Sequence, residues 1–217
     1  KVDEVEALMR WNDTQLGRLL PASFIPVAEH TGQIIPLGRW ALREACQQAH
    51  RWQLAGTPRA VAVNLSPVQL TDVELVGDIQ AALVAAELAA DWLRLEITEA
   101  EAIRDFQGTT RRLTQLRDLG IHLSLDDFGT GYSSLAMLRE LPVDTIKIDR
   151  SFVQRLDQPE SRADTVLVRA VIDTAHAFGL TVVAEGVEHT GQMAALAQMG
   201  CDRVQGFLLG CPEPAKQ

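Results

Sequence analysis

Polar side chains recur inside, or directly after, the apolar runs of this 217-residue sequence. A strand buried on both faces is usually an almost unbroken apolar run, because a polar group without a partner is costly to bury. In a barrel of parallel strands the downstream ends converge on one face, where such enzymes build their active sites. We therefore expect one site to gather the polar residues of these runs: Glu6, Asn64, Glu96, Asp126, Asp127, Lys147, Glu185 and Gln205.

The chemistry of this set points to divalent metal ions. Several carboxylates and an amide in one pocket repel one another unless cations neutralise them. Oxygen ligands without histidine or cysteine favour hard cations, so we expect Mg²⁺ or Mn²⁺ rather than zinc. The adjacent Asp126 and Asp127 can serve two ions, an arrangement that stabilises the attacking and leaving oxygens when a phosphodiester is cleaved. Single residues also have plainer explanations: Asn64 could cap a helix, and Lys147 could simply pair with Asp149.

The elements that must position these residues are visible as an alternating pattern. Short runs rich in Val, Ile and Leu alternate with stretches of helical periodicity, which is typical of βα units around a parallel sheet. Seven such runs begin near Glu4, Ala60, Trp92, Gly120, Thr145, Thr181 and Arg203. In the helix before the sixth run, the spacing predicts one buried face formed by Leu167, Val171, Ala175 and Phe178. Residues 12–24 and 156–164 are less regular, and we expect surface loops there.

Length and composition limit the possibilities further. A chain of 217 residues with 47% hydrophobic content suits one globular domain, residues 1–217. The net charge of −9 argues against binding to long nucleic acid, which relies on clustered Lys and Arg. Cys46, Cys201 and Cys211 are far apart, so neither a zinc site nor a disulfide framework is suggested and a cytoplasmic location fits best. No run approaches the roughly 20 apolar residues that span a bilayer, so we expect no membrane contact from this domain.

The sequence resembles the EAL domains, the phosphodiesterases of bacterial cyclic di-GMP signalling. The motif that names the family stands at Glu6-Ala7-Leu8, and further motifs follow in the family's order over the whole chain: LEITEA from Leu95, DDFGTGYSSL from Asp126, LPVDTIKIDRSFV from Leu141 and VVAEGVE from Val182. The tripeptide alone is a weak signal, whereas the combination is highly specific. The resemblance implies a (β/α)₈ TIM-like barrel, whose first strand is antiparallel, and hydrolysis of cyclic di-GMP to linear pGpG.

The resemblance also implies the metal ligands. Glu6, Asn64, Glu96 and Asp126 match the ligands of a first Mg²⁺ or Mn²⁺ ion. Asp126 and Asp127 match the ligands of a second ion. We therefore expect two ions, with Asp126 shared between them.

Other site residues have implied roles around these ions. Glu185 matches a glutamate that supports the second ion and has been regarded as a possible general base. Lys147 matches a lysine held near the attacking water, where its charge favours a hydroxide-like nucleophile, and Gln205 matches a residue close to that lysine. Glu99 matches the glutamate that anchors the loop carrying Asp126 and Asp127. The residues expected to contact the substrate are Arg10, Leu8 and Asp149.

The stretch after the DDFGTGYSSL motif is expected to contact a second copy of the chain. Residues 128–134 hold two glycines and small hydroxyl residues, which permit an unusual loop backbone. In the family the dimer interface lies near this loop and the following helix, so Ala136 to Leu141 is the stretch expected to meet a partner in a homodimer. The alternative is that this helix only covers the barrel.

The chain begins five residues before Glu6, so the first strand that the family carries upstream of its EAL motif is not among these residues. We expect that strand in the parent protein, which could also be attached to a membrane through parts not present here. A non-hydrolysing receptor for cyclic di-GMP is the main alternative function. A barrel enzyme acting on another phosphate or an enolate is a remoter one.

Overall fold

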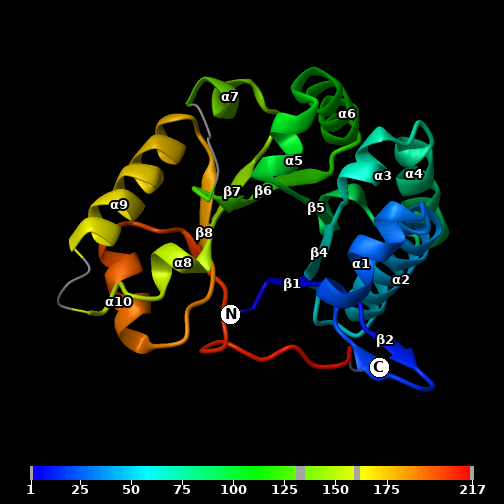
Figure 1. Ribbon diagram of the computed structural model, residues 1–217, viewed down its shortest axis with the longest axis horizontal. Helices are drawn as coiled ribbons and strands as arrows, with labels where there is room; N and C mark the ends of the chain where they lie inside the picture. The colour runs from blue at the N-terminus through cyan, green and yellow to red at the C-terminus, as the bar shows by residue number, and fades with distance from the viewer. Residues whose placement is uncertain (1, 131–134, 159–161, 216–217) are drawn as a thin grey trace. The chain divides into compact units, whose positions relative to one another are not determined.

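The computed structural model describes residues 2–130, 135–158 and 162–215 (Figure 1). The chain divides into two compact units. The first comprises Lys1–Ile97, Asp105–His122 and Ala215–Gln217, and the second comprises Thr98–Arg104 and Leu123–Pro214. Strands and helices alternate in both units, as the sequence predicts.

The first unit contains parallel strands in the order β1 (Glu4–Glu6), β4 (Ala60–Asn64) and β5 (Leu93–Thr98). The last residue of β5, Thr98, falls in the second unit. Their register pairs Glu6 with Ala62 and Asn64 with Glu96. A separate antiparallel hairpin consists of β2 (Trp11–Asp13) and β3 (Gly17–Leu19). The prediction of an irregular loop over residues 12–24 is therefore wrong: backbone N–H groups of the turn bond to Asp13 at 2.8 and 2.9 Å, which stabilises the hairpin.

Each α-helix of the first unit has buried residues. They are α1 (Pro21–His30), α2 (Ile34–Leu54), α3 (Pro67–Thr71), α4 (Leu75–Ala85), the 3₁₀ helix η1 (Ala90–Trp92) and α6 (Phe106–Asp118). The longest, α2, packs against α1, α3, α4 and β4. Leu42, Cys46 and Ala49 lie on its buried face, and burial raises the pKa of the Cys46 thiol to about 11, which keeps it protonated at neutral pH.

The second unit contains parallel strands in the order β6 (His122–Phe128), β7 (Thr145–Ile148), β8 (Thr181–Ala184) and β9 (Arg203–Val204). The first residue of β6, His122, falls in the first unit. The last of the predicted runs is thus a strand of only two residues. Its helices are α5 (Glu99–Arg104), α7 (Leu135–Glu140), α8 (Arg150–Val153), α9 (Arg162–Ala177) and α10 (Thr190–Gln198).

The buried face of α9 differs from the prediction. Ala175 is fully buried, as predicted, but the other fully buried residues are Val168 and Ile172, whereas the predicted Leu167 and Phe178 are 44% and 38% exposed. The stretch is apolar on both candidate faces, so packing against β8 selects the face one residue further along. None of the described helices combines the length and the apolar character that a membrane crossing needs.

Aspartates fasten the amino ends of the strands in the second unit. Asp144, directly before β7, accepts a hydrogen bond from the backbone N–H of Leu123 in β6 at 2.9 Å. Asp202, directly before β9, accepts one from the N–H of Val182 in β8 at 2.8 Å and another from His176 Nε2 at 2.8 Å. Burial raises the pKa of Asp202, but the bonds from His176 and Val182 outweigh it and the net pKa is lowered. These carboxylates satisfy backbone donors that the sheet leaves over.

Candidate functional site

The carboxyl ends of β6, β7 and β8 bring four predicted site residues together in the second unit. Lys147 Nζ, from β7, lies 2.7 Å from Glu185 Oε1 after β8 and 3.4 Å from Asp126 Oδ2 in β6. Asp126, Asp127 and Glu185 each offer one carboxylate oxygen, and these three oxygens lie within 4.8 Å of one another. The sequence predicted this gathering, and within this unit the structure confirms it.

A bulge in β6 allows two consecutive aspartates to share the cluster. Neighbouring side chains of a regular strand point to opposite faces. Between Leu125 and Phe128, however, β6 advances three residues while β7 advances two, from Ile146 to Ile148. Asp127 takes a left-handed conformation with φ of 54°, which is uncommon for a residue other than glycine. The bulge therefore turns the carboxylate of Asp127 towards those of Asp126 and Glu185. The spacing of the sequence gave no signal of this bulge.

Negative charge exceeds positive charge in this cluster. The Lys147 side chain is 3% exposed and pairs with two carboxylates. Burial and the neighbouring Asp126 and Asp149 raise the pKa of Asp127, and Lys147 and Arg150 offset this only in part. A bound cation would offset both the burial and the repulsion that raise the pKa of Asp127.

The donor set fits a hard divalent ion. The three oxygens are all carboxylate oxygens, the ligands that Mg²⁺ and Mn²⁺ prefer, and no described histidine or cysteine completes a group of this kind. Asp126, Asp127 and Glu185 are the residues of this unit that would hold such an ion.

Glu99 contacts the backbone just after the cluster. Its side chain is buried at the start of α5, and Oε2 accepts a hydrogen bond from the backbone N–H of Gly129 at 3.0 Å. Gly129 has φ of 98°, and a Cβ there would approach the ring of Phe152 to 2.9 Å. Glycine is therefore required just after the cluster. The rest of the predicted loop, residues 131–134, lies outside the described residues.

Two further predicted residues hold the backbone beside the cluster. The N–H of Gln205 donates to Ala184 O at 2.8 Å, and its carbonyl accepts from Val187 N at 3.0 Å, so the stretch after β9 flanks Glu185. Asp149 caps α8 by accepting from Ser151 N at 3.0 Å. Sequence reasoning missed Gly186, whose φ is 69° and where a Cβ would overlap Arg150; the glycine in AEGVE was the available signal.

The remaining predicted ligands lie in the first unit. Asn64 ends β4, and its Nδ2 donates to Glu6 Oε1 of β1 at 2.7 Å. Glu96 of β5 pairs with Asn64 in the strand register and is 1% exposed. Three adjacent strands therefore supply an oxygen-rich set. Of the predicted substrate contacts, Arg10 donates to Met9 O at 2.8 Å and Leu8 is 41% exposed.

The stretch predicted to contact a second copy is helical. It lies mainly in α7, where Arg139 and Glu140 are exposed, while Leu138 and Leu141 are buried in their own chain. The dimer stays a prediction.

Comparisons with known proteins agree on one family. The sequence profile described as "EAL domain" matches residues 1–212. The chain is 43% identical to the bifunctional diguanylate cyclase/cyclic di-GMP phosphodiesterase MucR of Pseudomonas aeruginosa, over 98% of this chain and 31% of that protein. It is 45% identical to the cyclic di-GMP phosphodiesterase NbdA of the same organism, over 99% of this chain and 27% of that protein. The chain thus spans less than a third of each.

Solved structures show the same likeness. The PaMucR phosphodiesterase in its c-di-GMP complex gives a TM-score of 0.92 at 42% identity, over 98% of this chain and 86% of that one. The FimX EAL domain from Pseudomonas aeruginosa bound to c-di-GMP gives 0.86 at 28% identity, over 96% of this chain and 83% of that one. The fold class predicted from the sequence is confirmed.

Proposed function

This chain belongs to the EAL domain family, and from that premise we propose that it is a phosphodiesterase that hydrolyses cyclic di-GMP to linear pGpG with two Mg²⁺ or Mn²⁺ ions. The relatives named as cyclic di-GMP phosphodiesterases, MucR and NbdA, support the substrate and the reaction. The observation that carries the proposal is the cluster at the carboxyl ends of β6, β7 and β8, where three carboxylate oxygens lie within 4.8 Å of one another beside Lys147.

The proposed metal ligands are those that the family resemblance implies. In the second unit they are Asp126 and Asp127, with Glu185 in support. In the first unit they are Glu6, Asn64 and Glu96. The bound ions would polarise the phosphoryl oxygens and lower the pKa of water.

The chain's own residues supply the remaining chemistry. Lys147 is held by Glu185 and Asp126, so its fixed charge would stabilise negative charge on the nucleophile and the phosphate. Glu185 would accept a proton from the attacking water, and Gln205 would help to position these groups. Glu99 would keep the backbone after Asp127 in place through Gly129.

The same proposal covers substrate and assembly. Arg10, Leu8 and Asp149 would contact the dinucleotide, with the guanidinium of Arg10 suited to a phosphate. A homodimer would form through residues 136–141, in which the exposed Arg139 and Glu140 would meet the partner. A single domain over residues 1–217 and a cytoplasmic location remain predictions.

Hydrolysis by the purified chain tests the proposal. We expect cyclic di-GMP to be converted to pGpG, identified by chromatography, with Mg²⁺ or Mn²⁺ but not with EDTA. Asp127→Asn should reduce turnover by about a thousandfold, roughly 4 kcal/mol of transition-state stabilisation. Asp202→Asn, a matched change at the other end of the strands, should leave it within about twofold. Full activity of Asp127→Asn would overturn the mechanism, and binding without turnover in the wild type would favour a receptor.

A further inference from the structure

We infer that Gln69 and Gly38 are positioning residues that hold Asn64 in place. This inference rests on the proposed function only for its consequence, since Asn64 is a proposed metal ligand; the structural claim concerns the metal-free chain. The residues involved all belong to the first unit.

Helix α3 begins three residues after Asn64, and a capping box fixes its start. Ser66, two residues on, is the N-cap of α3 and accepts a hydrogen bond from Gln69 N at 3.3 Å. In return, Gln69 Oε1 accepts from Ser66 N at 3.1 Å. Both side chains are buried, so this reciprocal pair sets the backbone path directly downstream of Asn64.

Gly38 of α2 makes room for the Gln69 side chain. A Cβ on Gly38 would overlap the Nε2 and Cδ atoms of Gln69, so the amide lies directly against the helix backbone. Glycine inside a helix is unfavourable relative to alanine, and here it permits close packing on a polar side chain. The start of α3 is thereby packed closely against α2, which also packs on β4.

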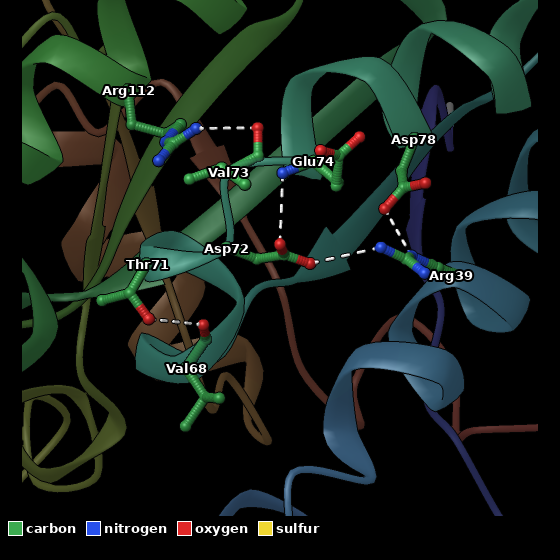
Figure 2. A network of polar contacts seen from close by, with 8 residues as sticks. All are labelled: Arg39, Val68, Thr71, Asp72, Val73, Glu74, Asp78 and Arg112. Atoms are coloured by element: carbon green, nitrogen blue, oxygen red, sulfur yellow. Dashed lines mark hydrogen bonds and ion pairs between the residues drawn. The ribbon is translucent and has the colours of Figure 1, made fainter.

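Arg39, the next residue of α2, ties down the far end of α3 (Figure 2). Its Nη2 lies 3.4 Å from Asp72 Oδ2 at the C-cap of α3, and its Nε lies 2.5 Å from Asp78 Oδ2 in α4. Asp72 Oδ1 also accepts from Glu74 N at 3.1 Å. Both ends of α3 are therefore fixed to neighbouring residues of one helix.

The consequence for Asn64 is a defined side-chain orientation. Asn64 is exposed at the last position of β4, and its carboxamide donates to Glu6 Oε1 at 2.7 Å. An exposed amide at a strand end can adopt several rotamers. The backbone that directs it to Glu6 is held by the bond from Leu65 N to Glu96 O, at 2.9 Å, and by the capping box of Ser66 and Gln69.

Nuclear magnetic resonance of the asparagine side chains tests this directly. The chain contains two asparagines, Asn12 and Asn64, so ¹⁵N-asparagine labelling gives two carboxamide signals, and the exposed Asn12 serves as the internal reference. In the metal-free wild type we expect the Asn64 signals to be shifted from those of Asn12 and to exchange more slowly with solvent. Asn64→Asp assigns them.

The informative variant is Gly38→Ala. Alanine favours the helix, but its methyl group displaces the end of Gln69 and leaves Ser66 N without its acceptor. The Asn64 signals should therefore move towards those of Asn12, while the midpoint of thermal unfolding falls no further than in the control variant Asp105→Ala. Gln69→Leu should have the same spectral effect. Gln69→Glu keeps the oxygen that accepts from Ser66 N and should preserve the wild-type spectrum. Asp105→Ala, which removes the N-cap of α6, should lower the unfolding midpoint and leave Asn64 unchanged.

The metal consequence is measured separately, by titrating Mn²⁺ and following the free ion by electron paramagnetic resonance. We expect Gly38→Ala and Gln69→Leu to weaken Mn²⁺ binding about tenfold and to lower kcat more than they raise KM, with Asp105→Ala unchanged. Unaltered Asn64 signals in Gly38→Ala and Gln69→Leu would overturn the inference, even in an active enzyme. Altered signals in a chain whose wild type neither binds Mn²⁺ nor turns over would sink the proposed function and leave the positioning role standing.

Discussion

Carboxylates lie at both ends of strands β6 to β9 in the second unit, and the two groups have different partners. At the amino ends, Asp144 and Asp202 accept hydrogen bonds from backbone N–H groups of the neighbouring strand. At the carboxyl ends, Asp126 and Glu185 share Lys147, and Asp127 stands beside them with a raised pKa.

The difference separates stability from chemistry. Backbone donors cannot leave, so the carboxylates at the amino ends are satisfied in the folded chain alone. The cluster at the carboxyl ends keeps an excess of negative charge that the described protein atoms only partly offset, and a bound cation would complete it. The excess negative charge at the carboxyl ends lowers the stability of the metal-free fold. The hydrogen bonds at the amino ends of the same strands offset part of that loss.

The largest effect that would sharpen this comparison is expected from Lys147→Met. Methionine keeps the apolar stem but leaves the partly buried Asp126 and Glu185 without the positive charge that they share. We expect the metal-free chain to lose about 3 kcal/mol of unfolding free energy. Turnover should fall by about a thousandfold. Denaturant unfolding with and without Mn²⁺ measures the first effect.

Added Mn²⁺ should stabilise Lys147→Met more than it stabilises the wild type, because the ion replaces a missing positive charge. Equal stabilisation of both chains would contradict the view that the carboxyl-end cluster is short of positive charge.

The sequence predicted at which strand ends the candidate site residues gather, but not how their side chains come together there. Apolar runs located β4 to β8 because burial on both faces demands them, and the polar exceptions marked the cluster. The bulge at Asp126 and Asp127 was invisible, since it depends on how β6 pairs with β7. The face of α9 was predicted one residue out because Leu167 and Val168 are both apolar, and only contact with the sheet decides between them.

A smaller effect is expected at the amino ends from Asp144→Ala. The N–H of Leu123, a residue that is 1% exposed, would lose its acceptor at 2.9 Å, which costs about 2 kcal/mol of unfolding free energy. Turnover should stay within about twofold of the wild type. Asp144→Asn retains a carbonyl oxygen and should recover part of the loss. A loss of activity without a loss of stability would break the separation between the two ends.

The smallest effect, below about 1 kcal/mol for each partly exposed group, is a pair of opposite pH dependences in the metal-free chain. The pKa of Asp202 is lowered: burial alone would raise it, but the bonds from His176 and Val182 prevail. Its contribution to stability is therefore present above the ordinary aspartate pKa of about 4 and is lost as pH falls through the lower folded value. The pKa of Asp127 is raised by burial, Asp126 and Asp149, so its contribution is present below about pH 4 and is lost as pH rises through the higher folded value.

In EDTA, raising the pH from about 3 to 6 should therefore make Asp202→Asn progressively less stable than the wild type and Asp127→Asn progressively more stable. Asparagine also suits the left-handed backbone at position 127, but that gain does not depend on pH, so the slope isolates the electrostatic part. If the unfolding free energies of the two variants, relative to the wild type, changed in the same direction with pH, the carboxylates at the two ends of these strands would not differ as their partners indicate.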